Sequence, residues 1–537
     1  MNHGIVLTIV VTACLLSAIL CPSYAQLGET NSKIIYVDVS NAGDPGEDGS
    51  ASHPFDSVQK GVDMADPGDV VQVAAGVYYE GVVIKKSTIS LVGVKGSTII
   101  DGNKTEETGI RIFNSPPNYS DGVSINGLTV RNCIKGITLS RSINIRLRDV
   151  NMTGNMYNFG DYTLQAHDID TSNTVDGRPI YFWVNQSDKQ IPADAGFVAL
   201  VRSTNITVKG LHLTNNVQSL VLKNTTHSLI LDLRVTNNWD GIYFDRWSNN
   251  NTIIDSEISD NLFMGIYVAT SSSNIICNNS IVNNAYGLLL DSTVYADTLG
   301  GIPGDINIVR YNTVVGNNVS NSSKFAVYLV DCEDNFFFHN NFNNSRQVYS
   351  SNSTSRWDND AEGNYWTDYT GTDSDKDGFG DTPYTIDTDN QDNHPLAGLF
   401  MDFHAVWQEA TYHLTAITDR ALSEVQFSQP DKTVTFGFNN GDNDSGFCRV
   451  SVPLALLGGP FTLVLDGMLS ADFTERSNDT HSFLYFTCDG VHNVEIRGTS
   501  VVVEYPSSLL FFLLAVVTVG AVTVASARKR LGPALSG

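Results

Sequence analysis

Three consecutive stretches decide the fold: QSLVLKNTTHSLILDLRVTNN (218–238), DGIYFDRWSNNNTIIDSEISDN (240–261) and MGIYVATSSSNIICNNSIVNN (264–284). Each contains three short runs rich in β-formers, separated by polar turns, and none has helical periodicity. The closing Asn recurs every 22 or 23 residues, at Asn216, Asn238, Asn261 and Asn284. A three-strand unit of this length is typical of one coil of a parallel β-helix, in which Asn at equivalent corners can form side-chain ladders.

Similar segments occur on both sides of these three. They are 135–155, 197–216 and 324–344. A short amphipathic helix is expected within 53–65, with Phe55, Val58 and Val62 on one side, and it would cover the open end of the stack. After residue 401 the repeat stops, and alternating runs separated by Gly, Asn and Asp turns indicate an antiparallel β-sandwich.

These patterns predict an all-β fold class: a right-handed parallel β-helix, then a small antiparallel β-sandwich, then a C-terminal transmembrane helix. The predicted segments are a signal peptide (1–25), the β-helix (33–398), the sandwich (401–504), the transmembrane helix (506–527) and a cytoplasmic tail (528–537). Within the β-helix we expect an N-terminal helix cap, an insert at 156–196 and a calcium-loop cap at 363–396.

The two ends indicate export and anchoring. An apolar run at 4–20 is followed by Ser23-Tyr24-Ala25, which is typical of a cleaved secretory signal, although the region before the run lacks Lys and Arg. The apolar run 509–527 is long enough to span a bilayer, and Arg528-Lys529-Arg530 would stay on the cytoplasmic side. We therefore expect a single-pass cell-surface protein whose β-domains lie outside.

The composition agrees with an extracellular location. With 58 acidic and 32 basic residues, the formal charge is −26, and a chain this acidic is not expected to bind nucleic acid. Many Asn-x-Ser/Thr sequons fit an exposed, glycosylated surface protein. Five cysteines follow the predicted signal, and Cys448 and Cys488 share a predicted domain, so whether they form a disulfide stays open.

Strand alternation assigns faces to the first strand of each coil. The inward pairs are Leu220/Leu222, Ile242/Phe244, Ile266/Val268, Leu288/Leu290 and Val327/Leu329. The outward positions would then carry a stripe of Tyr beside Asp. Because Tyr rings stack on sugars and carboxylates bind hydroxyls, the carbohydrate-binding candidates are Tyr243, Asp245, Tyr267, Asp291 and Tyr328. The alternative is that Tyr is simply a good strand residue whose flank is covered by a loop.

The acidic segment DSDKDGFGD (373–381) resembles the first part of an EF-hand calcium loop. Oxygen ligands would come from Asp373, Asp375, Asp377, the Phe379 carbonyl and Asp381. The pattern fails at position 12, where Tyr384 replaces the bidentate Glu. Because the segment follows the last coil, we expect Ca²⁺ to be structural there, with Tyr365, Trp366 and Tyr369 covering the end of the stack.

Two further segments carry a family resemblance. The insert NTVDGRPIYFWVNQSDKQIPADAGFVAL (173–200) and the close GNYWTDYTGTDSDKDGFGDTPYTIDTDNQDNHPL (363–396), together with the coils, resemble archaeal NosD-like surface proteins. These belong to the wider pectin-lyase-like set of β-helices that bind or cleave carbohydrates. The resemblance covers about residues 33–397 and implies fold and location more firmly than activity.

We therefore expect a membrane-anchored extracellular protein that binds carbohydrates, mediates adhesion or is a component of the cell envelope. Its expected partners are extracellular or envelope glycans. The alternative is a polysaccharide lyase, C5-epimerase or hydrolase acting on acidic glycans. Its candidate catalytic residues are Asp240, Asp245 and Arg246, with His167, Asp168 and Asp170 as a further possible group. A NosD-type role in metal-site maturation is disfavoured because no Cys or Met cluster suits copper and the His residues are scattered in sequence. Catalysis stays open, with a binding role favoured.

Overall fold

The computed structural model describes residues 32–501, except 106, 116–117, 294–307, 408–409, 424, 440–444 and 471. These residues form an all-β protein divided into two compact units. The first unit combines the chain up to Phe336 with Phe342–Arg356, and the second combines Phe337–Asn341 with the chain from Trp357 onward. Within the described part, no helix is long and apolar enough to cross a membrane. The predicted signal peptide, transmembrane helix and tail lie outside it.

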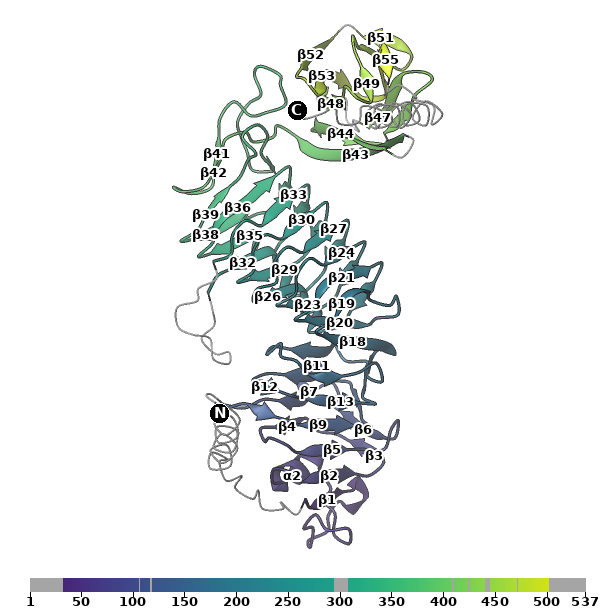
Figure 1. Ribbon diagram of the computed structural model, residues 1–537, viewed down its shortest axis with the longest axis vertical. Coiled ribbons are helices and arrows are strands. Elements are labelled where there is room, and N and C mark those ends of the chain that lie inside the picture. The colour runs from purple at the N-terminus through teal and green to yellow at the C-terminus, as the bar shows by residue number, and fades with distance from the viewer. Residues whose placement is uncertain are drawn as a thin grey trace, which may run out of the picture. The chain divides into compact units, whose positions relative to one another are not determined.

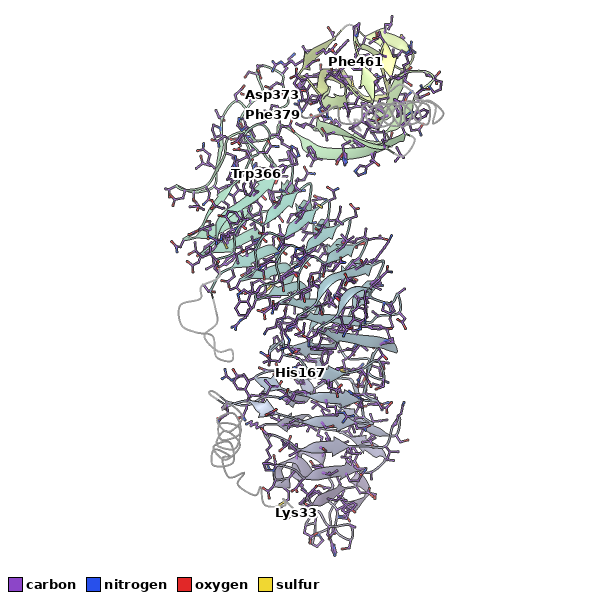
Figure 2. The ribbon with its side chains drawn as sticks, in the orientation of Figure 1. Lys33, His167, Trp366, Asp373, Phe379 and Phe461 are labelled. Atoms are coloured by element: carbon purple, nitrogen blue, oxygen red, sulfur yellow. The ribbon has the colours of Figure 1, made fainter. Side chains whose placement is uncertain are left out.

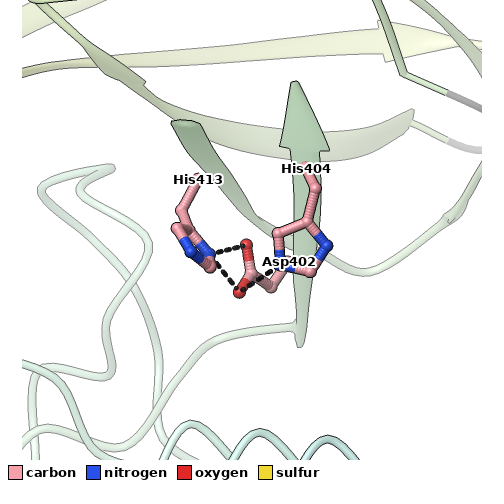
Figure 3. Close-up of side chains that lie close together, drawn as sticks. All are labelled: Asp402, His404 and His413. Carbon is pink, nitrogen blue, oxygen red and sulfur yellow. Dashed lines mark hydrogen bonds and ion pairs between the residues drawn. The ribbon is translucent and has the colours of Figure 1, made fainter. Parts of the chain in front are cut away.

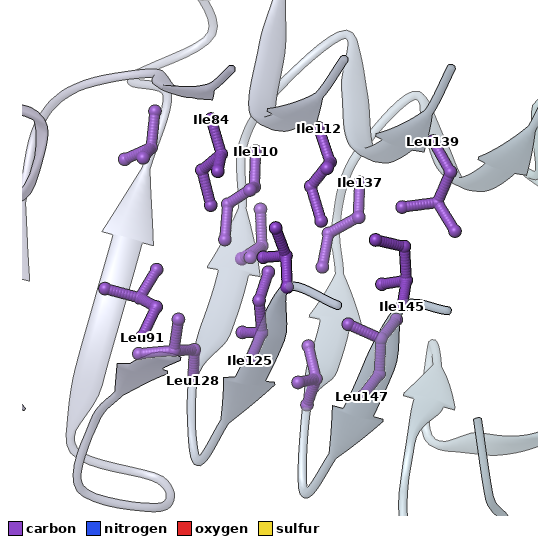
Figure 4. Packing of buried hydrophobic residues seen from close by; sticks show 14 of the residues in the cluster. Ile84, Leu91, Ile110, Ile112, Ile125, Leu128, Ile137, Leu139, Ile145 and Leu147 are labelled. Carbon is purple, nitrogen blue, oxygen red and sulfur yellow. The ribbon is translucent and has the colours of Figure 1, made fainter. Parts of the chain in front are cut away.

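The first unit begins with coils built from short parallel strands, which Figure 1 shows stacked one on another. One face is the sheet of β1 (Ile34–Val37), β2 (Val70–Val73), β5 (Ser90–Val92), β9 (Ser124–Asn126), β13 (Arg146–Arg148) and β16 (Asp168–Ile169). Another is the sheet of β4 (Val82–Ile84), β7 (Thr108–Ile112), β11 (Lys135–Leu139) and β15 (Tyr157–Asp161). Aliphatic side chains from successive coils fill the interior in layers, such as Ile84, Ile112 and Leu139 (Figure 4). Parallel pairing between successive coils defines a parallel β-helix.

A short helix, α2 (Val58–Met64), packs on the first strands. It begins one residue after Ser57, whose side chain accepts a hydrogen bond from the Lys60 amide, and its buried residues include Val58 and Val62. The expected helix is therefore present but shorter, since Phe55 lies before the cap in extended chain and pairs with the first strand at Val37.

The coil pattern changes after residue 175. Until then β15, β16 and β17 (Thr174–Val175) still pair in parallel with the preceding coil. β17 then turns back into β18 (Arg178–Val184) as an antiparallel hairpin, and β18 pairs in parallel with β20 (Phe197–Val201). The departure from regular coils is thus concentrated in this hairpin rather than spread over 156–196.

The later coils continue one long sheet in parallel register. Its strands after β20 are β23 (Gln218–Lys223), β26 (Asp240–Asp245), β29 (Met264–Ala269), β32 (Tyr286–Asp291), β35 (Phe325–Val330) and β38 (Val348–Ser351). Every side chain predicted to point inward is buried, with 1% exposure at most. The prediction of parallel coils and of their inward faces is confirmed.

Buried Asn side chains connect these coils, as the sequence predicted. The Oδ1 atom of Asn261 accepts hydrogen bonds from the amide (3.1 Å) and Nδ2 (3.0 Å) of Asn238, and Asn284 does the same for Asn261. A second ladder runs through Asn251, Asn274, Asn312 and Asn335. The residue before each Asn of the first ladder has positive φ, for example Asn237 (57°) and Asp260 (56°). Asn-Asn pairs therefore combine a left-handed turn residue with a ladder residue.

The second unit contains an antiparallel β-sandwich. One sheet is β43 (Leu399–Trp407), β44 (Ala410–Thr418), β48 (Ser445–Pro453), β53 (His481–Asp489) and β52 (Phe473–Ser477). The other includes β47 (Thr433–Asn439), β54 (Val491–Arg497) and β50 (Thr462–Leu465). Their inner faces share a core that includes Leu414, Phe436 and Phe486.

A partly buried charged cluster also connects segments of the second unit. Glu362 accepts from His339 Nε2 at 2.7 Å and from the Arg449 guanidinium at 3.1 Å. That guanidinium lies over the rings of Phe379 (4.6 Å) and Phe483 (4.4 Å). Burial opposes ionisation of Glu362, but the His339 hydrogen bond and the Arg449 charge outweigh it and hold the pKa of Glu362 below its usual value.

Candidate functional site

A cleft of about 360 Å³ opens on the outer surface of the first unit. It combines residues that precede the β17–β18 hairpin with residues from coils that follow it. The aromatic and charged residues that line it are Tyr119, Arg141, Tyr162, Tyr243, Asp245, Arg246 and Tyr267. The cleft therefore lies where the coil pattern changes, with lining residues from both sides of the hairpin.

Strand β26 places two predicted residues in this cleft. Tyr243 and Asp245 alternate with the core residues Ile242 and Phe244, so both point away from the interior. Asp245 pairs with Lys223 at 3.2 Å, which neutralises part of its charge. Burial, together with the neighbouring Tyr267 and Asp245, raises the pKa of the Tyr243 hydroxyl well above its usual value. Tyr243 therefore stays a neutral hydrogen-bond donor.

The outward stripe differs from the predicted exposed face. Tyr267 and Leu289 are only 5% and 7% exposed, because they pack with Tyr243, Tyr286 and Tyr328 in a cluster outside the main core. Tyr243 meets Tyr267 edge-on at 4.7 Å. The alternative that the Tyr residues are structural thus applies in part: large rings on neighbouring coils cover one another.

Two of the five predicted carbohydrate-binding residues do not reach the cleft. Asp291 is 8% exposed, and it accepts hydrogen bonds from Tyr267 (3.3 Å) and from the Thr293 amide (2.7 Å). Tyr328 lies on β35, three coils away from β26, and stacks on Tyr349 at 4.4 Å. Of the five predicted residues, the cleft therefore brings together Tyr243, Asp245 and Tyr267, joined by residues from earlier coils, and their carbohydrate binding stays a prediction.

Asp240, at the start of β26, has a different environment from the cleft. It is 5% exposed, and burial raises the pKa of its carboxyl to about 7, opposed by a hydrogen bond from Met264 and by the Lys135 charge. Its Oδ1 atom has no hydrogen-bond partner. The Lys135 ammonium lies 4.0 Å from the Trp239 ring centre, and that ring meets Tyr157 edge-on at 5.7 Å. A carboxyl that titrates near neutrality can act as a general base.

His167, Asp168 and Asp170 do not form a surface site together. His167 is 4% exposed; its Nδ1 accepts from the Ile145 amide at 3.1 Å and its Nε2 lies 3.2 Å from Asp161 (Figure 2). Asp168 and Asp170 are outside and pair with Arg148. The predicted group of His167, Asp168 and Asp170 is therefore not formed, because the stacking of the coils places the His167 ring in the interior and both carboxylates outside.

The acidic loop brings together three of its five predicted ligands. The carboxylates of Asp373, Asp375 and Asp377 converge within 4.8 Å, whereas Asp381 accepts from the Ser374 amide at 3.0 Å and lies outside that group. Burial and the charges of the other two carboxylates raise the pKa of Asp373. Hard oxygen donors of this kind suit Ca²⁺. Figure 2 labels Asp373 and Phe379 on this loop.

One group of possible metal ligands was not predicted from the sequence. Asp402, His404 and His413 lie close together on β43 and β44 (Figure 3), although the His residues look scattered along the chain. The sequence pattern that could have predicted this group is Asp402-x-His404 on one strand, followed by His413 on the next strand of the same hairpin. None of the five cysteines in the described residues, Cys448 and Cys488 included, forms a disulfide.

Comparison with known proteins supports the coil architecture. The family model described as "Periplasmic copper-binding protein (NosD)" matches residues 171–371. The probable ABC transporter binding protein NosD of Pseudomonas aeruginosa is 29% identical over 171 residues, which are 28% of this chain and 39% of that protein. The corresponding protein of Stutzerimonas stutzeri is 30% identical over 152 residues, covering 23% and 35%. The chain thus matches well under half of the length of these relatives.

Among solved structures, the alginate lyase from Paenibacillus sp. str. FPU-7 is 12% identical, covers 60% of this chain and 99% of its own, and has a TM-score of 0.25. That value is too low for a residue-by-residue comparison. The sequence matches and the parallel pairing of the coils lead to the same architecture: the chain contains a NosD-like parallel β-helix.

Proposed function

We propose that the protein is exported, held at the cell surface by a C-terminal helix, and binds acidic glycans in the cleft of its β-helix. The observation that carries this proposal is the lining of the cleft, which combines Tyr rings with Arg141, Arg246 and Asp245. Aromatic rings provide faces for sugar rings, and guanidinium groups bind carboxylates in bidentate geometry. A uronate chain matches this combination better than a neutral glycan does.

The test compares binding of oligouronates and of neutral oligosaccharides of equal length to the full chain. Tyr243→Ala and Arg246→Gln should each weaken oligouronate binding about tenfold, which corresponds to about 1.4 kcal/mol. Tyr349→Ala is the matched control, because Tyr349 is an exposed Tyr of the same sheet that does not line the cleft. Equal affinity for both ligand classes, or equal effects of all three substitutions, would contradict the proposal.

Catalysis on the same substrate class is a second candidate, favoured by Asp240. Asp240 and Asp245 are five residues apart on one strand, about 16 Å at a rise of about 3.3 Å per residue. Paired carboxylates of glycoside hydrolases are about 5–9.5 Å apart, so a hydrolase is the least compatible alternative. A lyase or C5-epimerase needs a base that removes a proton beside a carboxylate, and Asp240 with Lys135 could supply it. Unsaturated products that vanish in Asp240→Asn would establish a lyase, and uronates inverted at C5 that vanish in the same variant would establish an epimerase.

We also propose that Ca²⁺ binds at Asp373, Asp375 and Asp377 and stabilises the acidic loop. The support is the convergence of the three carboxylates and the Gly at position 378, whose φ of 90° favours glycine. A NosD-type role with metals is less well supported, since neither group of metal-ligating side chains in the described chain falls within the matched residues 171–371.

The proposed location can be tested separately from ligand binding. Residues 1–25 should be absent from the mature chain, which mass spectrometry of the purified protein would show. Removal of residues 506–537 should release the protein from membranes into the soluble fraction. Retention of the truncated protein in the membrane fraction would contradict the proposed anchor.

A further inference from the structure

The exposed face of the first sandwich hairpin carries Asp402, His404 and His413 as one group. We propose that this group binds one divalent transition-metal ion of the zinc class. The site is independent of the glycan cleft and of the acidic loop, and it lies outside the residues matched by the NosD family model. The proposal follows from the hairpin register, the distances between ligand atoms and their accessibility.

The register of the hairpin places all three side chains on one face. His404 pairs directly with His413 across β43 and β44, and Asp402 is two residues before His404. The alternate positions, such as Phe403, Ala405 and Leu414, belong to the sandwich core. Burial of those apolar neighbours therefore forces the Asp and both His side chains outward, whatever their own preferences.

The ligand atoms have the spacing that a tetrahedral ion requires. Oδ2 of Asp402 lies 2.9 Å from Nδ1 of His413 and 3.8 Å from Nε2 of His404, and the three ligand atoms lie within 4.8 Å of one another. Ligands at about 2.1 Å from a tetrahedral Zn²⁺ are about 3.4 Å apart, so small rotations of exposed side chains suffice. Figure 3 shows the carboxylate between the two rings.

The chemistry of the group suits a borderline metal rather than a hard one. Two imidazoles and one carboxylate are ligands typical of Zn²⁺, and with three protein ligands a fourth position stays open for water. His404 and His413 are exposed, so an ion can reach them from solvent. The strands on which they stand are paired along nine residues, which keeps the ligands preorganised.

The experiment measures Zn²⁺ binding to the full chain by calorimetry, with excess Ca²⁺ present to occupy the acidic loop, and uses Co²⁺ absorption as a spectroscopic probe. We expect one ion per chain and Co²⁺ bands of a four-coordinate site. His404→Gln and His413→Gln should each weaken Zn²⁺ binding by at least about tenfold, and Asp402→Asn by about tenfold to a hundredfold. The double His variant should bind no ion at this site.

His492→Gln is the matched control. His492 pairs with Asp466 at 2.8 Å on the other sheet, which reproduces the His–Asp contact but belongs to no group of three ligands in the described chain. It should leave Zn²⁺ affinity unchanged. Thermal unfolding without metal checks that each variant folds. The proposal is overturned if the double His variant binds Zn²⁺ as the wild type does, or if the wild type binds none.

Discussion

The later coils and the sandwich-containing unit satisfy their buried polar groups in different ways. In the coils, neutral amides repeat: each ladder Asn hydrogen-bonds to the next coil, so the same solution recurs at every turn. The described part of the second unit contains one such step, from Asn340 to Asn364, and adds a charged cluster of Glu362, His339 and Arg449 that occurs once. The repeated Asn ladder can be predicted from the sequence. The charged cluster cannot, because only tertiary contacts bring its three residues together. It also follows that the two units should respond differently to substitution and to pH.

The largest effect should come from breaking the charged cluster. Arg449→Ala removes a buried guanidinium, leaves the mostly buried Glu362 without that partner and should lower the free energy of unfolding of the second unit by about 3–5 kcal/mol. Chemical denaturation followed by Trp fluorescence measures this loss. Arg476→Ala is the matched control, because Arg476 is half-exposed in its pairs with Asp375 and Asp377 and should cost about 1 kcal/mol or less. Equal losses would mean that burial does not distinguish the two arginines.

The ladder should be the next most sensitive feature. Asn261→Ala removes the acceptor of the Asn238 amide and leaves buried groups without partners, so we expect a loss of about 3 kcal/mol in the first unit. Hydrogen exchange of the neighbouring coils reports where the stack opens. Lys209→Ala, an exposed position of β21 (Thr204–Lys209), should change stability by about 0.5 kcal/mol or less. A loss in Asn261→Ala no greater than that would show that the ladder contributes little.

Calcium should stabilise only the second unit. At a free Ca²⁺ concentration about 100 times the dissociation constant, linkage predicts about 2.7 kcal/mol of added stability. Asp373→Asn should abolish this gain, while Asp389→Asn, an exposed acid outside the converging group, should keep it. Calorimetric unfolding with and without chelator measures both. A gain that persists in Asp373→Asn would place the ion elsewhere.

The smallest effect should be a difference in pH dependence. Because the pKa of Glu362 is lowered in the folded state, its stabilising contribution is present above the unfolded pKa, about 4.3, and is lost as pH falls through the folded pKa. The cost of Glu362→Gln should therefore shrink on acidification. Amides do not titrate, so the cost of Asn261→Ala should stay constant over the same range. Denaturation at several pH values tests both, and equal pH slopes would contradict the comparison.

The features that sequence predicted are those set by repetition. Alternation placed Ile242 and Phe244 in the core, and recurrent Asn marked the ladder, because every coil poses the same packing problem. The outer face was predicted less well: Tyr267 is covered by rings from other coils, and coil stacking turns His167 inward. Such contacts depend on where the coil pattern changes, and a periodic pattern carries no information on that.

The His–Asp group shows the same limit in the sandwich. His413 is nine residues from His404 and eleven from Asp402, and only the hairpin register, with Trp407 opposite Ala410, brings it to them. A shift of the register by one residue would turn His413 toward the core. The site therefore depends on turn geometry that the composition of the segment does not specify.

The second ladder also has an implication for protein engineering. Asn251 and Asn274 are 23 residues apart, yet Asn274 and Asn312 are 38 apart and make the same contacts. The chain between β32 and β33 (Thr313–Val315) therefore lengthens one coil by 15 residues without disturbing the register of the stack. Because the described coils on both sides keep their register across this longer connection, foreign loops could be grafted between β32 and β33 while the ladder keeps the neighbouring coils aligned.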